Sequence, residues 1–282
     1  MINEQKIGMV ILNYNDSETV KAYYQLIKQY QSIDHIVIVD NASSDGSFDK
    51  LKGLAGGNID VIQTNQNKGY SYGNNYGAWY LMNNYHIDIL FISNPDVEYT
   101  EAFLKQIVFD MQKQHAQAAT GYMKLPYHEI MTRCTYTYWQ EIMECTFLLK
   151  HIIPFRGPCV NPNEGIIDVE WLPGSLFAID ANVYKELGGL DENIFLYFEE
   201  QILGKKLLDS NYKMIINTDI SYFHNSAISI NKSMKEVLKR KQAYKSKYYF
   251  YSTYHHIGKI KKVIMKLFFH YSIFRGKIRC YF

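Results

Sequence analysis

Short apolar runs alternate with polar clusters and amphipathic stretches through the first 115 residues. The apolar runs occupy residues 7–12, 36–39, 61–62 and 90–92. Ser17 follows the first polar cluster and suits the N-cap of a helix, in which Val20, Tyr23, Tyr24 and Ile27 recur at helical spacing. Strand and helix therefore alternate four times, which predicts a mostly parallel sheet flanked by helices on both faces.

The polar clusters follow the predicted strands directly. They occupy residues 13–16, 40–47, 65–75 and 94–96. Ligands of such sheets bind beyond the carboxyl ends of the strands. We therefore expect these four clusters to meet at one edge of the sheet and to form a binding site.

The pattern changes after residue 121. Residues 122–170 are irregular and contain four prolines, with a helical stretch around residues 138–150, and we interpret them as the variable wall of a substrate cleft. From Trp171 the pattern predicts a strand near residues 175–179, a short helix to Leu187, a Gly188-Gly189 turn and a helix to about Ser210.

Length and composition favour one large α/β domain with an appendage. The chain has 282 residues, of which 47% are hydrophobic. No run reaches the roughly 18 apolar residues needed to span a bilayer, and the N-terminus lacks a signal-peptide pattern. The spacing of the four cysteines favours reduced thiols. These features predict a protein of the cytoplasm, or one bound to a membrane from that side.

Charge is divided unevenly along the chain. Residues 232–282 hold 14 Lys and Arg and one acidic residue, a net of +13, which leaves −11 for residues 1–231. If residues 257–274 are helical, one face is basic, with Lys259, Lys262 and Lys266. The opposite face is apolar, with Ile257, Ile260, Ile264, Leu267, Phe268 and Tyr271.

This tail is typical of a helix that lies in a membrane interface. Packing on the preceding domain or on a dimer partner is the alternative. Binding to nucleic acid is disfavoured, because no recognition fold accompanies the charge.

Two of the strand-end loops suit a nucleotide. Asp40 and Asn41 open the loop 40–47 and could bind the base and ribose; alternatively, the loop is an Asx-rich turn that caps the next helix. Asn67 and Gly69 belong to a Gly/Asn-rich entry to a helix, where a backbone can approach a ligand closely. The glycine spacing matches neither a dinucleotide fingerprint nor a P-loop.

Asn94-Pro95-Asp96 follows the fourth strand. Asp96 could cap the helix that starts near Thr100. We favour a metal role, since one carboxylate with diphosphate oxygens and water commonly holds a hard divalent cation.

Taken in order, residues 12–15, 40–47, 67–69 and 94–96 resemble the motifs of family 2 of the inverting glycosyltransferases, which have the GT-A nucleotide-diphospho-sugar transferase fold. The sequence is most similar to the rhamnosyltransferase-like branch, in which Asn-Pro-Asp replaces Asp-x-Asp. The resemblance implies a GT-A domain over residues 1–230, divided into a nucleotide-sugar-binding half (1–121) and an acceptor-binding half (122–230), followed by a basic amphipathic helical tail (231–282). The residues that it implies for nucleotide-sugar binding are Asn13, Tyr14, Asn15, Asp40, Asn41, Asn67, Gly69, Asn94, Asp96 and Gly174.

The second half of the chain resembles the acceptor-side motifs of the same family. These are Trp171-Leu172-Pro173-Gly174-Ser175, Gly188-Gly189-Leu190-Asp191-Glu192 and the stretch 195–200. The resemblance implies that Glu200 is the general base, with Glu199 and Asp191 as further catalytic candidates. Ile202 departs from the pattern, because many relatives have a second acidic residue there. The alternative for the two glutamates is an ordinary first turn of a helix.

His224 and Ser229 match a further spacing of the family, near the diphosphate or the metal. The resemblance therefore implies Mn²⁺ or Mg²⁺ bound by Asp96 and His224. A purely structural His224 is the alternative.

These motifs predict an inverting transferase that moves one sugar from dTDP-rhamnose or a UDP-sugar to a growing surface, capsular or cell-wall polysaccharide. The acceptor could be linked to a polyprenyl diphosphate, and a homodimer is a further expectation. Two alternatives are a non-catalytic nucleotide-sugar-binding subunit and a sugar nucleotidyltransferase. The expected location is the cytoplasm, peripheral on the inner face of the plasma membrane.

Overall fold

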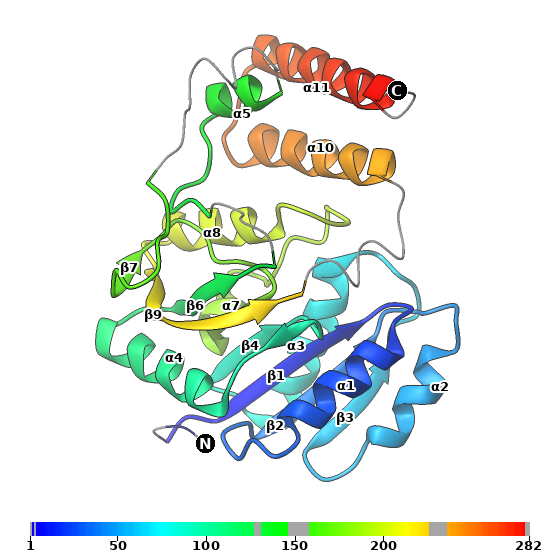
Figure 1. Ribbon diagram of the computed structural model, residues 1–282, viewed down its shortest axis with the longest axis vertical. Helices are drawn as coiled ribbons and strands as arrows, with labels where there is room; N and C mark the ends of the chain where they lie inside the picture. The colour runs from blue at the N-terminus through cyan, green and yellow to red at the C-terminus, as the bar shows by residue number, and fades with distance from the viewer. Residues whose placement is uncertain (1, 3, 127–130, 146–157, 226–235, 280–282) are drawn as a thin grey trace.

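A computed structural model describes residues 2, 4–126, 131–145, 158–225 and 236–279. The strands of the described residues form one nine-stranded sheet in the order β3-β2-β1-β4-β8-β6-β9-β5, with β7 paired to β9. Helices cover both faces of this sheet (Figure 1).

The N-terminal half of the sheet is parallel, as the alternating pattern predicts. It consists of β1 (Ile7–Asn13), β2 (His35–Asp40), β3 (Ile59–Gln63) and β4 (Ile89–Ser93). The connections contain α1 (Ser17–Ile27), α2 (Ser47–Leu51), the 3-10 turn η1 (Lys52–Leu54) and α3 (Tyr70–Tyr85).

Side chains of β1 alternate between two apolar cores. Ile7, Met9 and Ile11 pack with α1 on one face, whereas Val10 packs with Ala78 of α3 on the other. Because successive strand residues point to opposite faces, the apolar run of β1 supplies both layers. The carboxyl end of the strand is thereby fixed between two covered faces.

The other half of the sheet is mixed. β8 (Leu176–Asp180) lies antiparallel to both β4 and β6 (Ala118–Lys124), and β6 is parallel to β9 (Met214–His224). Two short strands, β5 (Val97–Glu98) and β7 (Ile166–Asp168), pair antiparallel with β9. The remaining helices of this half are α4 (Glu101–Gln114), α7 (Ala181–Glu186) and α8 (Glu199–Asp209). The strand predicted near residues 175–179 is confirmed as β8.

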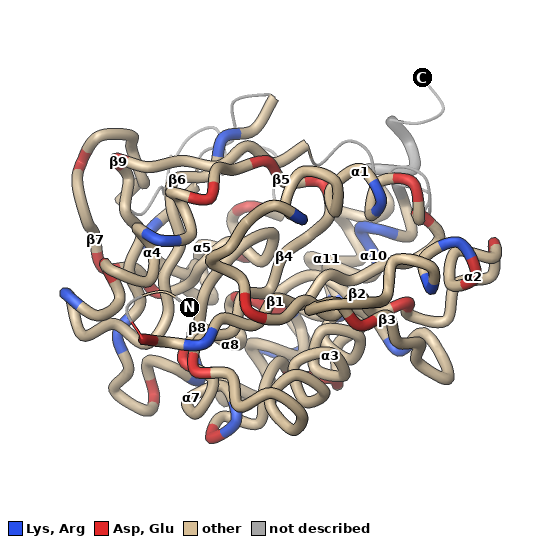
Figure 2. Tube along the Cα trace, turned by 90° about the horizontal axis from the view of Figure 1, so that it is seen from below, with Lys and Arg blue, Asp and Glu red and all other residues tan. Residues whose placement is uncertain are grey.

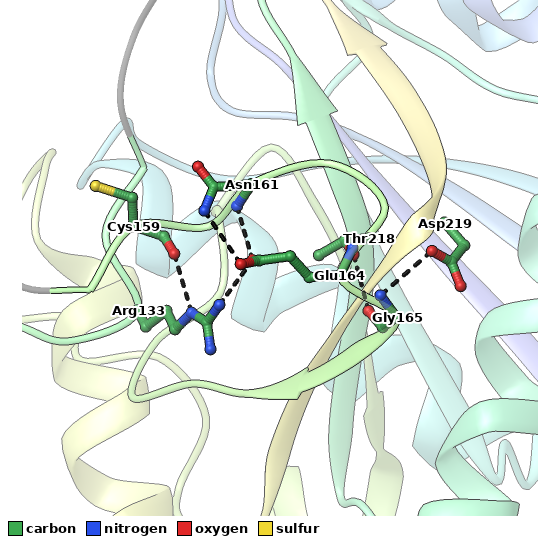
Figure 3. A network of polar contacts seen from close by, with 7 residues as sticks. All are labelled: Arg133, Cys159, Asn161, Glu164, Gly165, Thr218 and Asp219. Carbon is green, nitrogen blue, oxygen red and sulfur yellow. Dashed lines mark hydrogen bonds and ion pairs between the residues drawn. The ribbon is translucent and has the colours of Figure 1, made fainter.

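A polar network holds the described parts of the irregular segment against β9 (Figure 3). Arg133 Nη2 lies 2.6 Å from Glu164 Oε2, and Arg133 Nε donates to the carbonyl of Cys159 at 2.9 Å. The backbone N–H of Glu164 donates to Thr218 Oγ1 of β9 at 2.7 Å. The predicted helix of this segment is α5 (Tyr138–Glu144), and residues 146–150 lie outside the described residues.

The two C-terminal helices pack on the acceptor-side half. They are α10 (Glu236–Thr253) and α11 (Lys259–Arg279), at the end of the molecule opposite the N-terminus (Figure 1). Their core cluster includes Phe250, Tyr251 and Met265 and joins them to α5 and α8. Lys247 Nζ lies 2.5 Å from the buried carboxylate of Glu141 on α5. The basic tail is therefore a helical hairpin packed on the domain.

No helix among the described residues has the length and apolarity that crossing a membrane requires. Cys134, Cys145 and Cys159 are free thiols, whereas Cys280 lies outside the described residues.

Candidate active site

The buried carboxylate of Asp40 organises the loops at the carboxyl ends of β1 and β2. The strand register places Asn13 directly opposite Asp40, and Asn13 Nδ2 donates to Asp40 Oδ1 at 2.7 Å. The Ser43 backbone N–H and Gln63 Nε2 both donate to Asp40 Oδ2 at 3.0 Å. Because Asp40 has no exposed surface, these donors compensate the cost of burying its charge.

The loop after β1 is fixed to the loop after β2 by two further bonds. Asn15 N–H donates to Ser43 Oγ, and Ser44 N–H donates to Asn15 Oδ1, both at 2.8 Å. Asn15 has a φ of 54°, a left-handed conformation that Asn tolerates. Tyr14 keeps 42% of its surface exposed between these fixed residues. Its ring is therefore accessible for stacking on a planar ligand.

Asn41 joins the loop after β2 to the entry of α3. Its Nδ2 atom lies 3.1 Å from both Asn67 Oδ1 and the carbonyl oxygen of Gly69, and its Oδ1 accepts from Thr64 at 3.0 Å. Asn67 Oδ1 also accepts the Gly69 N–H at 2.9 Å. Asn41 and Asn67 thus hold the two loops together, and α2 begins after Gly46 without a side-chain cap bond.

Gly69 is the point at which the loop before α3 meets the loop before α8. The next residue, Tyr70, donates its backbone N–H to the carbonyl of Phe195 at 2.9 Å. A Cβ atom on Gly69 would lie 2.1 Å from that same carbonyl oxygen. Gly69 has φ 108° and ψ −177°, a conformation essentially restricted to glycine. Only glycine allows this approach without displacing the backbone.

Asp96 lies beside His224 where β5 pairs with β9. The β5–β9 register pairs Val97 with His224, and Asn225 N–H donates to the carbonyl of Asp96 at 2.8 Å. Asp96 Oδ1 is 3.3 Å from His224 Nε2. Thr100, and not Asp96, caps α4 by accepting from Phe103 N–H. The helix-cap alternative for Asp96 is therefore wrong.

Asp96 and His224 fit a divalent cation as a two-residue donor set. A carboxylate oxygen and an imidazole nitrogen are both ligands that Mn²⁺ accepts. No group of three or more His, Cys, Asp or Glu side chains suited to a metal occurs among the residues that the structure describes. A cation at Asp96 would therefore take its remaining ligands from substrate oxygens and water.

Tyr70, whose role the sequence did not indicate, joins the two halves of the site. Its hydroxyl donates to the carbonyl oxygen of Gly174 at 2.7 Å and lies 3.1 Å from Asn94 Oδ1. Burial, together with the charges of Glu199 and Glu200, raises the pKa of Tyr70 well above its usual value. Tyr70 therefore stays protonated and can keep donating. Its position after Gly69, as the first residue of α3, is the only sequence signal that could have pointed to it.

Glu199 and Glu200 begin α8 after a left-handed turn, in which Phe198 has a φ of 76°. Glu199 is 7% exposed. The position of a Cβ on Gly174 would be 3.9 Å from Glu200 Oε2, so the carboxylate lies next to the Gly174 backbone.

Burial raises the pKa values of both glutamates. The pKa of Glu200 is raised to about 7. Burial and the neighbouring charge of Glu200 raise the pKa of Glu199 well above its usual value. Glutamates in an ordinary, solvated first turn of a helix would keep their usual pKa values. Carboxyl groups with strongly raised pKa values are frequent at functional sites.

Asp191 connects the acceptor-side loop to the C-terminal helices. Its Oδ2 atom accepts from the hydroxyls of Tyr249 at 2.9 Å and Tyr254 at 2.6 Å. Its Oδ1 atom accepts from the backbone and side chain of Asn193, each at 2.8 Å. Burial alone would raise the pKa of Asp191, but these hydrogen bonds outweigh burial and lower it. Asp191 also lines a polar cavity of about 380 Å³ with Lys206.

Comparison with known proteins places similarity to this chain among glycosyltransferases. Residues 9–144 match the family model described as Glycosyl transferase family 2. The chain is 25% identical over 198 residues to the low-salt glycan biosynthesis hexosyltransferase Agl10 of Haloferax volcanii, covering 69% of this chain and 59% of the relative. It thus spans about three fifths of the length of that curated relative.

Two solved structures share the fold. The mannosyltransferase PcManGT from Pyrobaculum calidifontis, in complex with GDP-Man and Mn²⁺, superposes with a TM-score of 0.59 at 14% identity, covering 96% of this chain and 69% of the other. GalNAc-T7 with UDP, GalNAc and Mn²⁺ superposes with a TM-score of 0.60 at 14% identity, covering 94% and 55%. The fold is that of GT-A glycosyltransferases, and the similarity to glycosyl transferase family 2 covers residues 9–144.

The contact at Gly69 predicts a large stability loss for Gly69→Ala. We expect the free energy of unfolding to fall by more than about 2 kcal/mol, because the new Cβ meets the Phe195 carbonyl in a strained conformation. Gly57→Ala is the matched control, since Gly57 has a φ of 62° and no atom within 4 Å of the added Cβ. It should lose about 1 kcal/mol. Urea denaturation followed by tryptophan fluorescence measures both, and equal losses would contradict the predicted contact.

Proposed function

We propose that this chain, which contains a glycosyltransferase family 2 domain, transfers one sugar from a nucleoside-diphosphate sugar to a growing bacterial surface glycan with inversion at the anomeric carbon. The observation that supports this most is the junction at Gly69 and Tyr70. It holds the donor-side loops directly against the loop that leads to Glu199 and Glu200. An enzyme that joins two substrates needs both sites fixed in one geometry.

The donor is proposed to be dTDP-rhamnose or a UDP-sugar. Exposed Tyr14 would stack on the base, and the loops ordered by Asp40 and Asn41 would hold the nucleoside. Asn94, which is partly exposed beside Tyr70, would contact the diphosphate or sugar. The choice of rhamnose rests on the Asn-Pro-Asp motif at residues 94–96.

Asp96 and His224 would hold Mn²⁺ or Mg²⁺ in this proposal. The two side chains adjoin, and the donor's own oxygens would complete the ligand set. A bound cation would offset the negative charge that develops on the departing diphosphate. The Mn²⁺ in the solved structures of PcManGT and GalNAc-T7 supports the same cofactor class.

Glu200 is the proposed general base. The acceptor hydroxyl oxygen forms a bond to the anomeric carbon, the bond from that carbon to the diphosphate breaks, and the diphosphate leaves with the electron pair. The hydroxyl proton passes to the Glu200 carboxylate. Burial and the charge of Glu200 raise the pKa of Glu199 well above its usual value, so a protonated Glu199 is proposed to lie beside the base without competing for that proton.

The two alternative functions receive less support. A non-catalytic binding subunit has no need for two carboxyls with raised pKa values at the junction of two sites. A sugar nucleotidyltransferase would need a Gly-rich basic loop after the first strand to bind triphosphate. Residues 13–16 are Asn-Tyr-Asn-Asp instead.

We also propose a location at the inner face of the plasma membrane, with an acceptor linked to a polyprenyl diphosphate. Support comes from the basic C-terminal helices, in a region with a net charge of +13. The name of the Haloferax relative, which places that protein in glycan biosynthesis, agrees with a glycan acceptor. A homodimer remains an alternative use of these helices.

The proposed metal site predicts that Asp96→Ala abolishes Mn²⁺-dependent donor binding. We expect at least about a tenfold loss of the affinity for nucleoside diphosphate in the presence of Mn²⁺, since one of two protein ligands is gone. Isothermal titration with and without Mn²⁺ measures this effect. Asp219→Asn, a change on the same strand as His224, should bind like the parent. Unchanged Mn²⁺ dependence in Asp96→Ala would exclude Asp96 as a ligand.

The proposed base predicts a pH dependence of activity. Only ionised Glu200 can accept a proton, so kcat/KM should rise with pH through an apparent pKa of about 7 and then level off. Glu200→Gln should lose about 100-fold to 10,000-fold in kcat. Glu199→Gln should keep both the activity and the pH limb, because the amide resembles the protonated acid. The reverse outcome would assign the base to Glu199.

A further inference from the structure

The outer face of α11 presents a continuous apolar stripe to solvent. We define the stripe by five residues whose exposure lies between 48% and 78%: Ile260, Val263, Leu267, Tyr271 and Phe274. Their spacing of three and four residues places them on one side of the helix. Single exposed apolar side chains are common, but five in a row along one helix form a patch of the kind that marks an interaction surface.

The stripe is separate from the face of α11 that packs on the protein. Met265 and Phe269 are buried in the cluster shared with α10, and Phe269 stacks on Tyr244 with ring centroids 4.4 Å apart. Ile264 and Phe268 pack partly against the same cluster. The helix therefore has two apolar sides, one packed against α10 and one facing outward. The sequence predicted one apolar face for residues 257–274. In the structure, the residues of that predicted face are divided between the two apolar sides.

Positive charge is concentrated in the two helices of the hairpin. The sequence of α11 contains seven Lys and Arg and no Asp or Glu, and that of α10 contains five Lys and Arg and one Glu. Lys259, Lys261 and Lys266 of α11 are exposed. In the N-terminal half, by contrast, Lys and Arg are scattered among Asp and Glu (Figure 2). The concentration of positive charge is specific to the hairpin.

Either a second copy of the chain or a lipid surface could cover this stripe. The positive charge of the hairpin favours the lipid surface. A second copy of the chain would bring its own basic α11 against the first, and like charges at close range would oppose that contact. An anionic lipid surface attracts the lysines, at roughly 1 kcal/mol for each basic residue near the surface. The same surface accepts apolar side chains at its headgroup boundary.

We propose that the stripe of α11 is a membrane-docking surface, with its apolar side chains inserted at the headgroup boundary of an anionic bilayer and the exposed lysines of the same helix attracted to lipid phosphates. Trp139 of α5, 53% exposed, lies under Lys261, whose Nζ is 6.0 Å from the indole ring. This aromatic side chain adjoins the lysine-bearing first turn of α11 and suits the interfacial region.

Contacts from the hairpin fix the position of the loop before α8, which leads to the proposed base. Ser246 Oγ of α10 donates to the carbonyl of Leu196 at 2.8 Å, and the rings of Phe198 and Phe250 lie 5.4 Å apart. Tyr249 and Tyr254 hold Asp191 at the start of the same loop. Docking of α11 would therefore fix Glu199 and Glu200 relative to the bilayer. This last step rests on the proposed function, because it gives a lipid-linked acceptor a defined approach.

Vesicle flotation of the full-length protein tests the docking surface. We expect binding to phosphatidylcholine vesicles that contain phosphatidylglycerol, weak binding to phosphatidylcholine alone, and weakening by salt. Val263→Ser with Leu267→Ser should reduce binding at least about tenfold, because two apolar side chains no longer insert. The control pair Leu26→Ser and Phe109→Ser changes similarly exposed residues on α1 and α4 and should bind like the parent. Equal binding of the stripe variant and the control would overturn the proposal.

Two further measurements distinguish membrane docking from dimerisation through the stripe and from the proposed transferase function. Light scattering without vesicles should give the same mass for the parent and the stripe variant; a parent dimer that the stripe variant dissolves would assign the stripe to a second copy and overturn membrane docking. Donor hydrolysis in solution should be unchanged in the stripe variant, and Glu200→Gln should still float with anionic vesicles. Vesicle binding without any donor turnover in the parent would leave docking supported and refute the proposed function alone.

Discussion

The candidate site depends on one close backbone contact, in which the chain at Gly69 and Tyr70 touches the carbonyl of Phe195. The Tyr70 N–H bonds to that carbonyl, and the missing side chain of Gly69 leaves the space that the carbonyl oxygen occupies. The contact joins a loop before α3 to a loop before α8, about 125 residues later in the sequence. Together with the bond from the Tyr70 hydroxyl to the Gly174 carbonyl and the bonds between Asn75 and Leu190, this contact fixes the start of α3 relative to the loop that leads to the two glutamates.

The charged side chains of the site fall into two groups. Asp96 and His224 form one group at the β5–β9 pair, and Glu199 and Glu200 form the other at the start of α8. Tyr70 lies between them, with contacts to Asn94 and Gly174. Burial raises the pKa of both glutamates, to about 7 for Glu200 and well above the usual value for Glu199. One group thus suits a cation and a diphosphate, and the other suits proton transfer.

Much of the donor-side half could be predicted from the sequence, because its signals are local. Apolar runs of β1, β2 and β4 end in polar residues, and parallel pairing brings Asn13 beside Asp40. Local patterns could not predict the bond from Asn41 to the Gly69 carbonyl or the role of Tyr70. Both depend on partners in other loops. The insertion of β8 between β4 and β6 is likewise a long-range pairing.

In the C-terminal region, too, the sequence predicted the helix but not its packing partners. Helical spacing predicted an amphipathic α11, but periodicity alone cannot distinguish which of two apolar sides packs on the protein. Phe269 became buried against Tyr244 of α10, whereas Leu267 remained exposed. The binding of Asp191 by Tyr249 and Tyr254 joins residues 58 and 63 positions apart. No local pattern around Asp191 indicates that its hydrogen-bond donors lie in the basic tail.

The most direct test of the account is a crystal structure with Mn²⁺ and a nucleoside diphosphate, in which anomalous scattering locates the metal. The account predicts one manganese peak in contact with the Asp96 carboxylate and the diphosphate, with Glu200 free of metal on the acceptor side. Manganese bound by Glu199 and Glu200, with Asp96 free, would contradict it.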